Sequence, residues 1–259
     1  MTTLLDDLKA ANAYEEPTAP RVLTVDIETS PNLVYTWGIW QQNVSISQIV
    51  EPSRVLCFAA KWLGDKQVQF FSEYHDGREA MIQAAWELYN EADVVVTYNG
   101  VRFDNAHLQR EWLLAGFSPP KPWIDCDLLV EVKRHFKFQS NKLAFVTDQT
   151  GLPTKLDTGG QSLWNAVMNN DSKAWEKFKN YNRQDVKITE QLFLFLQKWI
   201  KGPHSGQWTG RMFACYACGS DDLTFSGVQR YRTLSYPTVT CSRCGTVNKL
   251  LRSGQTRAA

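Results

Sequence analysis

The stretch Val22-Leu-Thr-Val-Asp26-Ile-Glu28-Thr29 decides the fold. Four of its first six residues are apolar, which predicts a β-strand over Arg21–Ile27, and Pro31 interrupts the chain soon afterwards. Asp26 and Glu28 are two residues apart, so their side chains share one face of the strand. They lie near the end of the strand, where α/β sheets commonly place ligand sites. A solvated strand end would carry the same two acids, so the pair needs support from the rest of the chain.

Regular elements are predicted on the C-terminal side of this strand. Further strands rich in β-branched and aromatic residues are expected over Leu33–Trp40, Arg54–Leu63, Gln67–Ser72 and Asp93–Tyr98. Apolar spacing predicts helices over Gly77–Asn90, Asn105–Gly116, Asp127–Phe136, Asn141–Thr150, Ser162–Asn169 and 172–200. Strands followed mostly by helices predict an α/β fold in which helices pack on a mixed sheet.

A second motif, Val96-Thr-Tyr-Asn99-Gly100-Val-Arg-Phe103-Asp104, follows the strand at Asp93–Tyr98. Asn-Gly is a strong turn signal. Asp104 then stands where the next helix begins. An aspartate at that position has two readings, a ligand for a metal ion or an N-cap that accepts backbone hydrogen bonds.

The third motif lies on the long helix predicted after Ser172. Apolar and aromatic residues recur at intervals of three and four, which defines one face of a helix, and the face comprises Trp175, Phe178, Tyr181, Asp185, Ile188, Leu192, Phe195 and Trp199. Asp185 therefore occupies the inward face, where an unpaired carboxylate would cost several kcal/mol. A metal ion or a salt bridge to a Lys or Arg must neutralise it. Tyr181 lies one turn earlier and addresses the same site.

The cysteines divide into two groups. Cys57 and Cys126 lie in apolar surroundings and are expected to be inert buried thiols. The other four form two CxxC pairs, Cys215-Tyr-Ala-Cys218 and Cys241-Ser-Arg-Cys244, each followed by a glycine that suits a tight turn. Two such pairs close a tetrahedral Zn²⁺ site, and hairpin-like segments between them resemble a zinc ribbon. Two disulfides or a redox pair are the alternatives, and disulfides would require an exported chain.

Charge and hydropathy exclude several classes of protein. Residues 201–259 carry eight basic and two acidic side chains, a net charge of +6, whereas residues 1–200 carry 20 basic and 25 acidic ones. A basic tail suits a polyanion or serves only solubility. Stretches such as Leu192–Leu196 are far shorter than the ~20 residues that cross a bilayer, and residues 1–20 do not form a secretory signal. We therefore expect a soluble, cytoplasmic protein.

Taken together, the three acidic motifs resemble those of the DEDD (DnaQ-like) superfamily of 3′–5′ exonucleases. The matching segments are "DIET" with Asp26 and Glu28, "YNGVRFD" with Asp104, and "YNRQD" with Tyr181 and Asp185. The tyrosine is typical of the DEDDy subtype. Within it, the motifs are similar to family B polymerase proofreading domains and to stand-alone YprB-like nucleases, for which a bacterial or phage-encoded setting is expected. The resemblance covers about residues 20–200 and implies a ribonuclease-H-like fold.

The resemblance also implies a mechanism with two Mg²⁺ or Mn²⁺ ions. Asp26, Glu28 and Asp185 would hold the first ion, and Asp26 would bridge to the second. Asp104 would support the second ion, and Tyr181 would orient the attacking water. The phenol is a poor free base at neutral pH because its reference pKa is near 10.

Other residues are assigned to substrate contacts, helix caps or packing. Contacts to the terminal nucleotide are expected from Thr29, Asn99, Phe103 and Lys142. Asp127 is expected to cap a helix and Asp125 to lie on the surface. The ten tryptophans are expected mostly in the core. Base stacking by Trp37, Trp40 and Trp208 is the alternative to packing.

The expected organisation is an N-terminal arm (1–19), a ribonuclease-H-like exonuclease domain (20–202), a linker (203–207), a zinc ribbon (208–251) and a tail (252–259). The leading function is a metal-dependent 3′–5′ exonuclease acting on single-stranded ends, with DNA favoured over RNA. The ribbon would bind nucleic acid or a replication or repair protein. An endonuclease on structured nucleic acid and a non-catalytic nucleic-acid-binding adaptor are the alternatives.

Overall fold

The computed structural model describes residues 20–154, 159–200, 213–251 and 256–258. The predicted N-terminal arm and linker, together with Trp208, lie outside the described residues. The chain divides into two compact units, and one of them spans Arg21–Phe195. The other contains the four-cysteine segment, and each unit is described by itself below.

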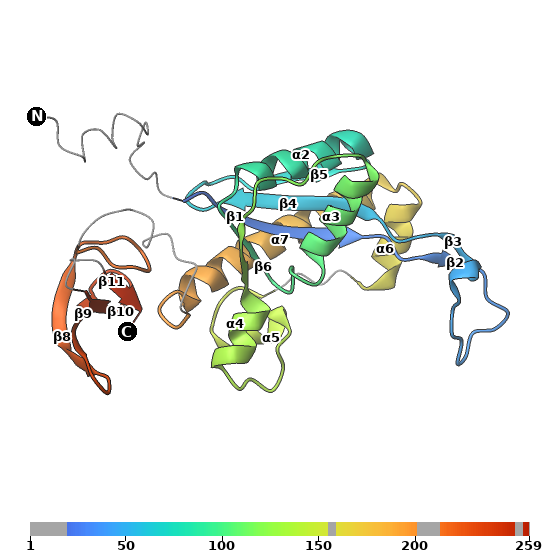
Figure 1. The fold of residues 1–259 in the computed structure, drawn as a ribbon. Helices are drawn as coiled ribbons and strands as arrows, with labels where there is room; N and C mark the ends of the chain where they lie inside the picture. The colour runs from blue at the N-terminus through green and yellow to red at the C-terminus, as the bar shows by residue number, and fades with distance from the viewer. Residues whose placement is uncertain (1–19, 155–158, 201–212, 252–255, 259) are drawn as a thin grey trace, which may run out of the picture. The chain divides into compact units, whose positions relative to one another are not determined.

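A five-stranded mixed sheet forms the centre of the larger unit (Figure 1). Its order is β5-β4-β1-β6-β7, with bounds β1 Val22–Thr29, β4 Val55–Trp62, β5 Gln69–Ser72, β6 Val94–Thr97 and β7 Ile124–Asp127. The pairs β1–β4 and β4–β5 are antiparallel, whereas β1–β6 and β6–β7 are parallel. The predicted α/β fold with a mixed sheet is confirmed.

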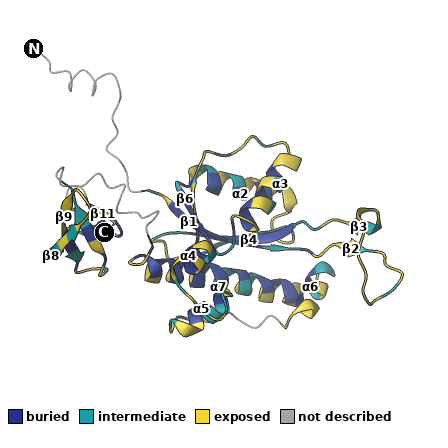
Figure 2. Ribbon diagram, turned by 60° about the horizontal axis from the view of Figure 1, so that its bottom comes forward, coloured by how far each residue is buried: buried dark blue, intermediate teal, exposed yellow. Residues whose placement is uncertain are grey.

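Helices cover both faces of the sheet (Figure 2). α2 (Arg78–Glu91) and α3 (Asp104–Leu114) pack on one face, against side chains of β1 such as Leu23, Val25 and Ile27. α6 (Gln161–Met168) and α7 (Ser172–Leu196) cover the opposite face. Two shorter helices follow β7, namely α4 (Leu128–His135) and α5 (Leu143–Gln149).

A buried ion pair ties α7 to the sheet. Lys61 on β4 donates from its Nζ to Glu190 Oε1 at 2.6 Å, and both residues are less than one-tenth exposed. The predicted apolar face of α7 is confirmed from Trp175 to Leu192 but is wrong at its end, because Phe195 is 38% and Trp199 56% exposed. Spacing of three and four residues drifts around a straight helix by about 20° every seven residues. The buried positions therefore pass to Phe193, Leu196 and Ile200.

Two strand predictions differ from the structure. β7 was not predicted, because its sequence Ile-Asp-Cys-Asp is short and alternates with acids, whereas the parallel partner β6 gives it a place in the sheet. The strand predicted over Leu33–Trp40 shrinks to β2, Leu33–Val34. β2 pairs only with the short β3 (Ile49–Glu51), which follows a 3₁₀ turn at Ile46–Gln48. Without a neighbouring strand, the rest of the stretch has no ladder to join.

Residues 35–45 consequently form a loop that projects beyond β2 and β3 (Figure 1). Packing in the core was expected for Trp37 and Trp40, and this expectation is wrong. Their exposed fractions are 103% and 85%.

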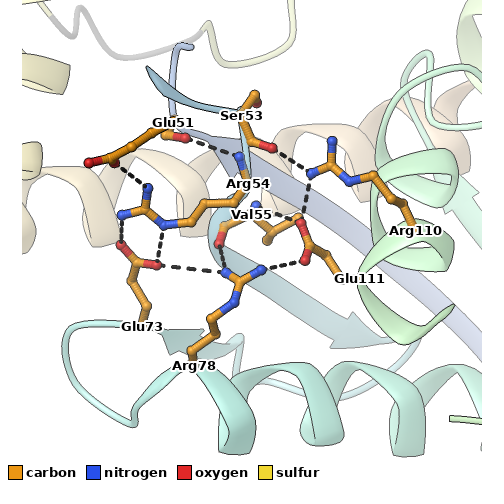
Figure 3. A network of polar contacts seen from close by, with 9 residues as sticks. Glu51, Ser53, Arg54, Val55, Glu73, Arg78, Arg110 and Glu111 are labelled. Carbon is orange, nitrogen blue, oxygen red and sulfur yellow. Dashed lines mark hydrogen bonds and ion pairs between the residues drawn. The ribbon is translucent and has the colours of Figure 1, made fainter. Parts of the chain in front are cut away.

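A polar network anchors the start of β4 to α2 and α3 (Figure 3). The side chain of Glu111 on α3 is 2% exposed and accepts hydrogen bonds from Val55 N at 3.2 Å and from Arg110 at 2.7 Å. Glu111 also pairs with Arg78 from α2. Arg54 makes two hydrogen bonds to Glu73, at 2.9 and 3.0 Å, and these bonds raise the pKa of its guanidinium.

The smaller unit contains a four-stranded antiparallel sheet in the order β11-β10-β9-β8. The strands span Leu223–Arg230 (β8), Ser235–Cys241 (β9), Val247–Leu250 (β10) and Thr256–Ala258 (β11). The predicted hairpin is present as β8–β9. β11 lies within residues 252–259, which the sequence assigned to a tail. Its three residues, Thr-Arg-Ala, carry no strand-like alternation of their own, and the pairing with β10 places them in the sheet.

We predict that Glu111→Ala lowers the free energy of unfolding by about 2–3 kcal/mol, because the variant leaves two arginines and the Val55 N–H without their shared acceptor. Chemical denaturation of the purified variant measures the change. The control is Glu87→Ala on α2, an exposed residue that accepts from Gln83 at 2.8 Å, for which we expect a change below about 0.5 kcal/mol. Equal loss in the two variants would contradict the anchoring role of Glu111.

Candidate active site

Three carboxylates converge between β1 and α7. Asp26 and Glu28 come from β1, Asp185 comes from α7, and one carboxylate oxygen from each lies within 4.8 Å of those of the other two. Asp26 and Glu28 are half-buried, whereas Asp185 is 1% exposed. The alternation of β1 explains the arrangement, because Val25 and Ile27 pack against α2 and α3 while the acids face the other side. The structure therefore brings together three of the four predicted acidic residues.

The side-chain amide of Asn182 fixes one of these carboxylates. Its Nδ2 donates to Asp26 Oδ2 at 2.7 Å and to the Asp26 carbonyl at 3.1 Å, and the residue is fully buried. Asn182 precedes Asp185 by three residues, so both occupy the same face of α7. No role was predicted for Asn182 from the sequence. The same spacing that selected Asp185 would have found it.

The fourth acidic residue, Asp104, binds the backbone of β1 between Asp26 and Glu28. It is the first residue of α3, is 4% exposed, and accepts from the Ile27 N–H through Oδ1 at 2.9 Å. The pairing of β1 with β6 ends at Thr24 and Val96. The Asp104 carboxylate therefore accepts from an N–H group of β1 that lies beyond the parallel ladder. Phe103, not Asp104, is the N-cap of α3. The N-cap reading of Asp104 is therefore wrong.

A tight turn places α3 next to β1. Asn99 adopts a positive φ of 73°, and a Cβ on Gly100 would lie 2.2 Å from Thr97 Oγ1, so the turn needs the Asn-Gly pair. Asp127 Oδ1 accepts from Asn99 N at 2.9 Å and from Leu129 N at 3.0 Å. The predicted helix cap at Asp127 is confirmed, and the same side chain also fixes the turn.

Tyr181 is half-buried one turn before Asp185, and its ring lies edge-on to that of Trp164, with centroids 6.5 Å apart. Trp164 in turn donates from Nε1 to the carbonyl of Thr29 at 3.0 Å. This indole therefore links α6 to both the end of β1 and the phenol of Tyr181.

The predicted nucleotide contacts occupy several elements. Thr29 ends β1, Asn99 forms the turn after β6, and Phe103 is 38% exposed with its ring 4.5 Å from that of His107. Lys142 is exposed at the start of α5. The hydroxyl of Tyr98, beside Asn99, donates to the carbonyl of Asn141 at 2.7 Å. This bond joins the turn after β6 to the residues that precede α5.

Two cysteines of the larger unit are buried thiols, as expected. Burial raises the pKa of Cys57 well above its ordinary value, and the carboxylates of Glu28 and Asp26 act in the same direction. Burial also raises the pKa of Cys126 to about 12.

Asp125 is exposed, as predicted, and accepts from Asn105 and Trp123.

The remaining four cysteines form one group in the smaller unit. One Sγ from each lies within 4.8 Å of the other three, with separations of 3.6 Å for Cys215–Cys244 and 3.7 Å for Cys218–Cys241. Disulfide sulfurs are about 2.05 Å apart, so the disulfide alternative is wrong. Four sulfurs about 2.3 Å from a tetrahedral Zn²⁺ ion would be about 3.8 Å apart. The group therefore has the spacing of a metal site.

The two CxxC turns have the same backbone construction. Gly219 donates to the Cys215 carbonyl and Gly245 to the Cys241 carbonyl, each at 2.8 Å. Both glycines have positive φ, 73° and 72°, which confirms the predicted tight turns.

The family model for the RNase_H superfamily matches residues 50–197. This match spans more than half of the chain, so the protein belongs to the RNase_H superfamily. The matched segment includes Asp104, Tyr181 and Asp185 but begins after β1 and its two acids.

The chain is also similar in structure to the family B DNA polymerase from the hyperthermophilic archaeon Pyrobaculum calidifontis, with a TM-score of 0.51 and 18% identity. The similarity covers 86% of this chain and 32% of the polymerase, so it supports the fold only. No curated protein matches the sequence significantly.

These comparisons confirm the ribonuclease-H-like fold, and the superfamily supports a hydrolytic nuclease that binds nucleic acid. Among the described residues, no helix has the length and apolar character needed to cross a membrane.

We predict that alkylation at pH 8 modifies Cys57 and Cys126 only after unfolding, because burial raises the pKa of both thiols. At the pKa of about 12 of Cys126, roughly one thiol in 10⁴ is ionised. The four clustered cysteines should become reactive once a chelator removes bound metal. Mass spectrometry counts the modified thiols, and the double variant Cys57→Ser/Cys126→Ser should keep the same count of four. Rapid modification of all four before chelation would contradict a metal-bound cluster.

Proposed function

We propose that this protein is a metal-dependent 3′–5′ exonuclease of the DEDDy subtype that hydrolyses single-stranded nucleic-acid ends, with DNA favoured. The observation that carries the proposal is the convergence of Asp26, Glu28 and Asp185 from β1 and α7. Three negative charges so close to one another would repel a phosphodiester unless cations bind between them. The RNase_H superfamily supplies independent support for phosphodiester hydrolysis.

The donor set fits Mg²⁺ or Mn²⁺, because both ions prefer carboxylate oxygens. Asp26, Glu28 and Asp185 would hold the first ion, and Asp26 would also face the second. One Asp104 oxygen is engaged by the Ile27 N–H, so we assign Asp104 to the second ion through water. The bound cations would acidify the attacking water and neutralise charge on the phosphate.

Other residues of the chain position the reacting groups. Asn182 holds the Asp26 carboxylate in one orientation through the 2.7 Å hydrogen bond. Tyr181 orients the attacking water and assists the loss of its proton, since its hydroxyl and Asp185 address one site from the same helix face. Trp164 fixes the ring of Tyr181 relative to the end of β1. Thr29, Asn99, Phe103 and Lys142 remain the proposed contacts to the terminal nucleotide.

For the smaller unit we propose a structural Zn²⁺ bound by Cys215, Cys218, Cys241 and Cys244, because thiolates prefer this ion and the sulfur spacing matches its tetrahedral site. The zinc ribbon would bind nucleic acid or a replication or repair protein. We retain the proposed domain limits of 20–202 for the nuclease and 208–251 for the ribbon, and extend the ribbon sheet to include β11.

We predict that Asp185→Asn abolishes Mg²⁺-dependent digestion, because the amide preserves shape but removes a charged ligand. The assay uses a single strand labelled at its 5′ end, on which the wild-type protein should produce a ladder of single-nucleotide steps. Tyr181→Phe should lower the rate by ~10²–10⁴-fold at saturating Mg²⁺, as expected for loss of a proton-transfer partner.

The matched control is Asp148→Asn, an exposed aspartate on α5, which should retain the wild-type rate. A single internal cut would indicate an endonuclease, and release of the labelled nucleotide first would indicate the opposite polarity. Near-wild-type turnover by Asp185→Asn would contradict the metal assignment.

A further inference from the structure

The segment that runs from β2 to β3 exposes several large apolar side chains. We call residues 32–50 the aromatic arm. Its strongly exposed side chains, with their exposed fractions, are Tyr35 76%, Trp37 103%, Ile39 88%, Trp40 85% and Ile46 88%. Exposed apolar patches of this kind mark interaction sites more often than chance placement.

The aromatic arm carries no charged residue over its 19 positions, although charged residues make up 21% of the chain. The first 200 residues have a net charge of −5. The aromatic arm is therefore an uncharged part of a domain whose net negative charge repels a polyanion. Its polar residues are amides and hydroxyls such as Gln41, Asn43 and Ser45.

The base of the aromatic arm is held firmly. Ser30 N donates to the Arg54 carbonyl at 2.9 Å, Arg54 N donates to Ser30 Oγ at 3.0 Å, and Ser53 N donates to Asn32 Oδ1 at 2.7 Å. Arg54 and Ser53 belong to the network of Figure 3, which joins this base to α2 and α3. The arm therefore projects from an anchored part of the sheet.

Hydrogen bonds also shape the arm internally. The side chain of Gln48 donates to the Tyr35 carbonyl at 2.9 Å and accepts from Ser45 N at 2.8 Å. Thr36 donates to the Gly38 carbonyl at 2.6 Å, and Gln42 to the Trp40 carbonyl at 2.9 Å. These contacts order the backbone while the indole rings remain exposed to solvent.

We propose that the aromatic arm is a stacking platform for unpaired bases of the strand whose 3′ end occupies the carboxylate site, with Trp37 and Trp40 as the stacking residues. This inference rests on the proposed function.

Continuity with the active site favours nucleic acid over a protein or lipid partner. Glu28 and Thr29 end β1, and the chain passes from them directly into the aromatic arm (Figure 1). The eight residue-to-residue steps from Thr29 to Trp37 span at most about 26–29 Å, so the platform lies within reach of a strand bound at the carboxylates. Base stacking on aromatic rings tolerates any sequence and needs no charge on the platform.

The test compares binding of a fluorescent 16-nucleotide oligothymidylate to full-length variants, without added Mg²⁺ and without chelator, so that the strand stays intact and the cysteine site keeps its metal. We expect Trp37→Ala/Trp40→Ala to weaken binding by about 30-fold or more. Trp37→Phe/Trp40→Phe should recover most of the affinity because it restores the π-faces. The matched control, Ile39→Ala/Ile46→Ala, removes equally exposed aliphatic surface and should leave binding nearly unchanged.

A second substrate separates this inference from the proposed function. Hydrolysis of the p-nitrophenyl ester of thymidine 5′-monophosphate with Mg²⁺ reports on the carboxylate site alone, and the Trp→Ala pair should retain the wild-type rate. If no variant hydrolyses the ester, the proposed function fails while the binding comparison still decides the role of the arm. Unchanged oligonucleotide binding by the Trp→Ala pair would overturn the inference. Equal losses of affinity in the tryptophan and isoleucine pairs would also overturn it. So would a result in which the Trp→Ala pair changes only the self-association of the protein or its binding to phosphatidylcholine vesicles.

Discussion

Mutual repulsion among Asp26, Glu28 and Asp185 is the constraint on which the rest of the larger unit depends. The chain holds one oxygen of each within 4.8 Å of the others, an arrangement that costs free energy until cations bind. Its surroundings oppose the relaxation of that cluster. Asn182 clamps the Asp26 carboxylate, and the Lys61–Glu190 ion pair keeps α7 against β4. Asp104 holds β1 at Ile27, between the two acids. The polar contacts of the site thus preserve a geometry that electrostatics alone would open.

The proposed nucleic-acid contacts depend on other anchored parts of the larger unit. The Arg–Glu network around Glu111 fixes the start of β4 and thereby the base of the aromatic arm. The stability of the smaller unit has a different origin. Its core consists of only a few residues around Cys215, Tyr216 and Cys241. Small domains of this kind usually need a metal ion to fold. Asn248 assists by accepting from Tyr216 N and donating to the Thr246 carbonyl, which ties one CxxC turn to β10.

The convergence of three acids could be predicted from the sequence because each of them lies in an element with a strong local signal. Period-two alternation places Asp26 and Glu28 on one face, and helical spacing places Asp185 inward. What it missed depends on distant neighbours. β7 exists through its pairing with β6. Residues 35–40 of the aromatic arm, by contrast, join no strand although they favour β-structure. The same lack of a partner strand leaves Trp37 and Trp40 exposed, although their apolar side chains suggested a place in the core. Asn182 was missed although it shares the helix face of Asp185, because its role depends on the Asp26 carboxylate that it binds.

The most direct test of the central claim is a crystal of the full-length protein soaked in Mn²⁺ and measured at a wavelength where manganese scatters anomalously. We predict an anomalous peak about 2.2 Å from carboxylate oxygens of Asp26, Glu28 and Asp185, at the distance typical of such small oxygen-bound cations. The same peak should be absent from Asp185→Asn crystals soaked in the same way. A cluster that holds only water at saturating Mn²⁺, or a cation bound elsewhere in the larger unit, would contradict the account.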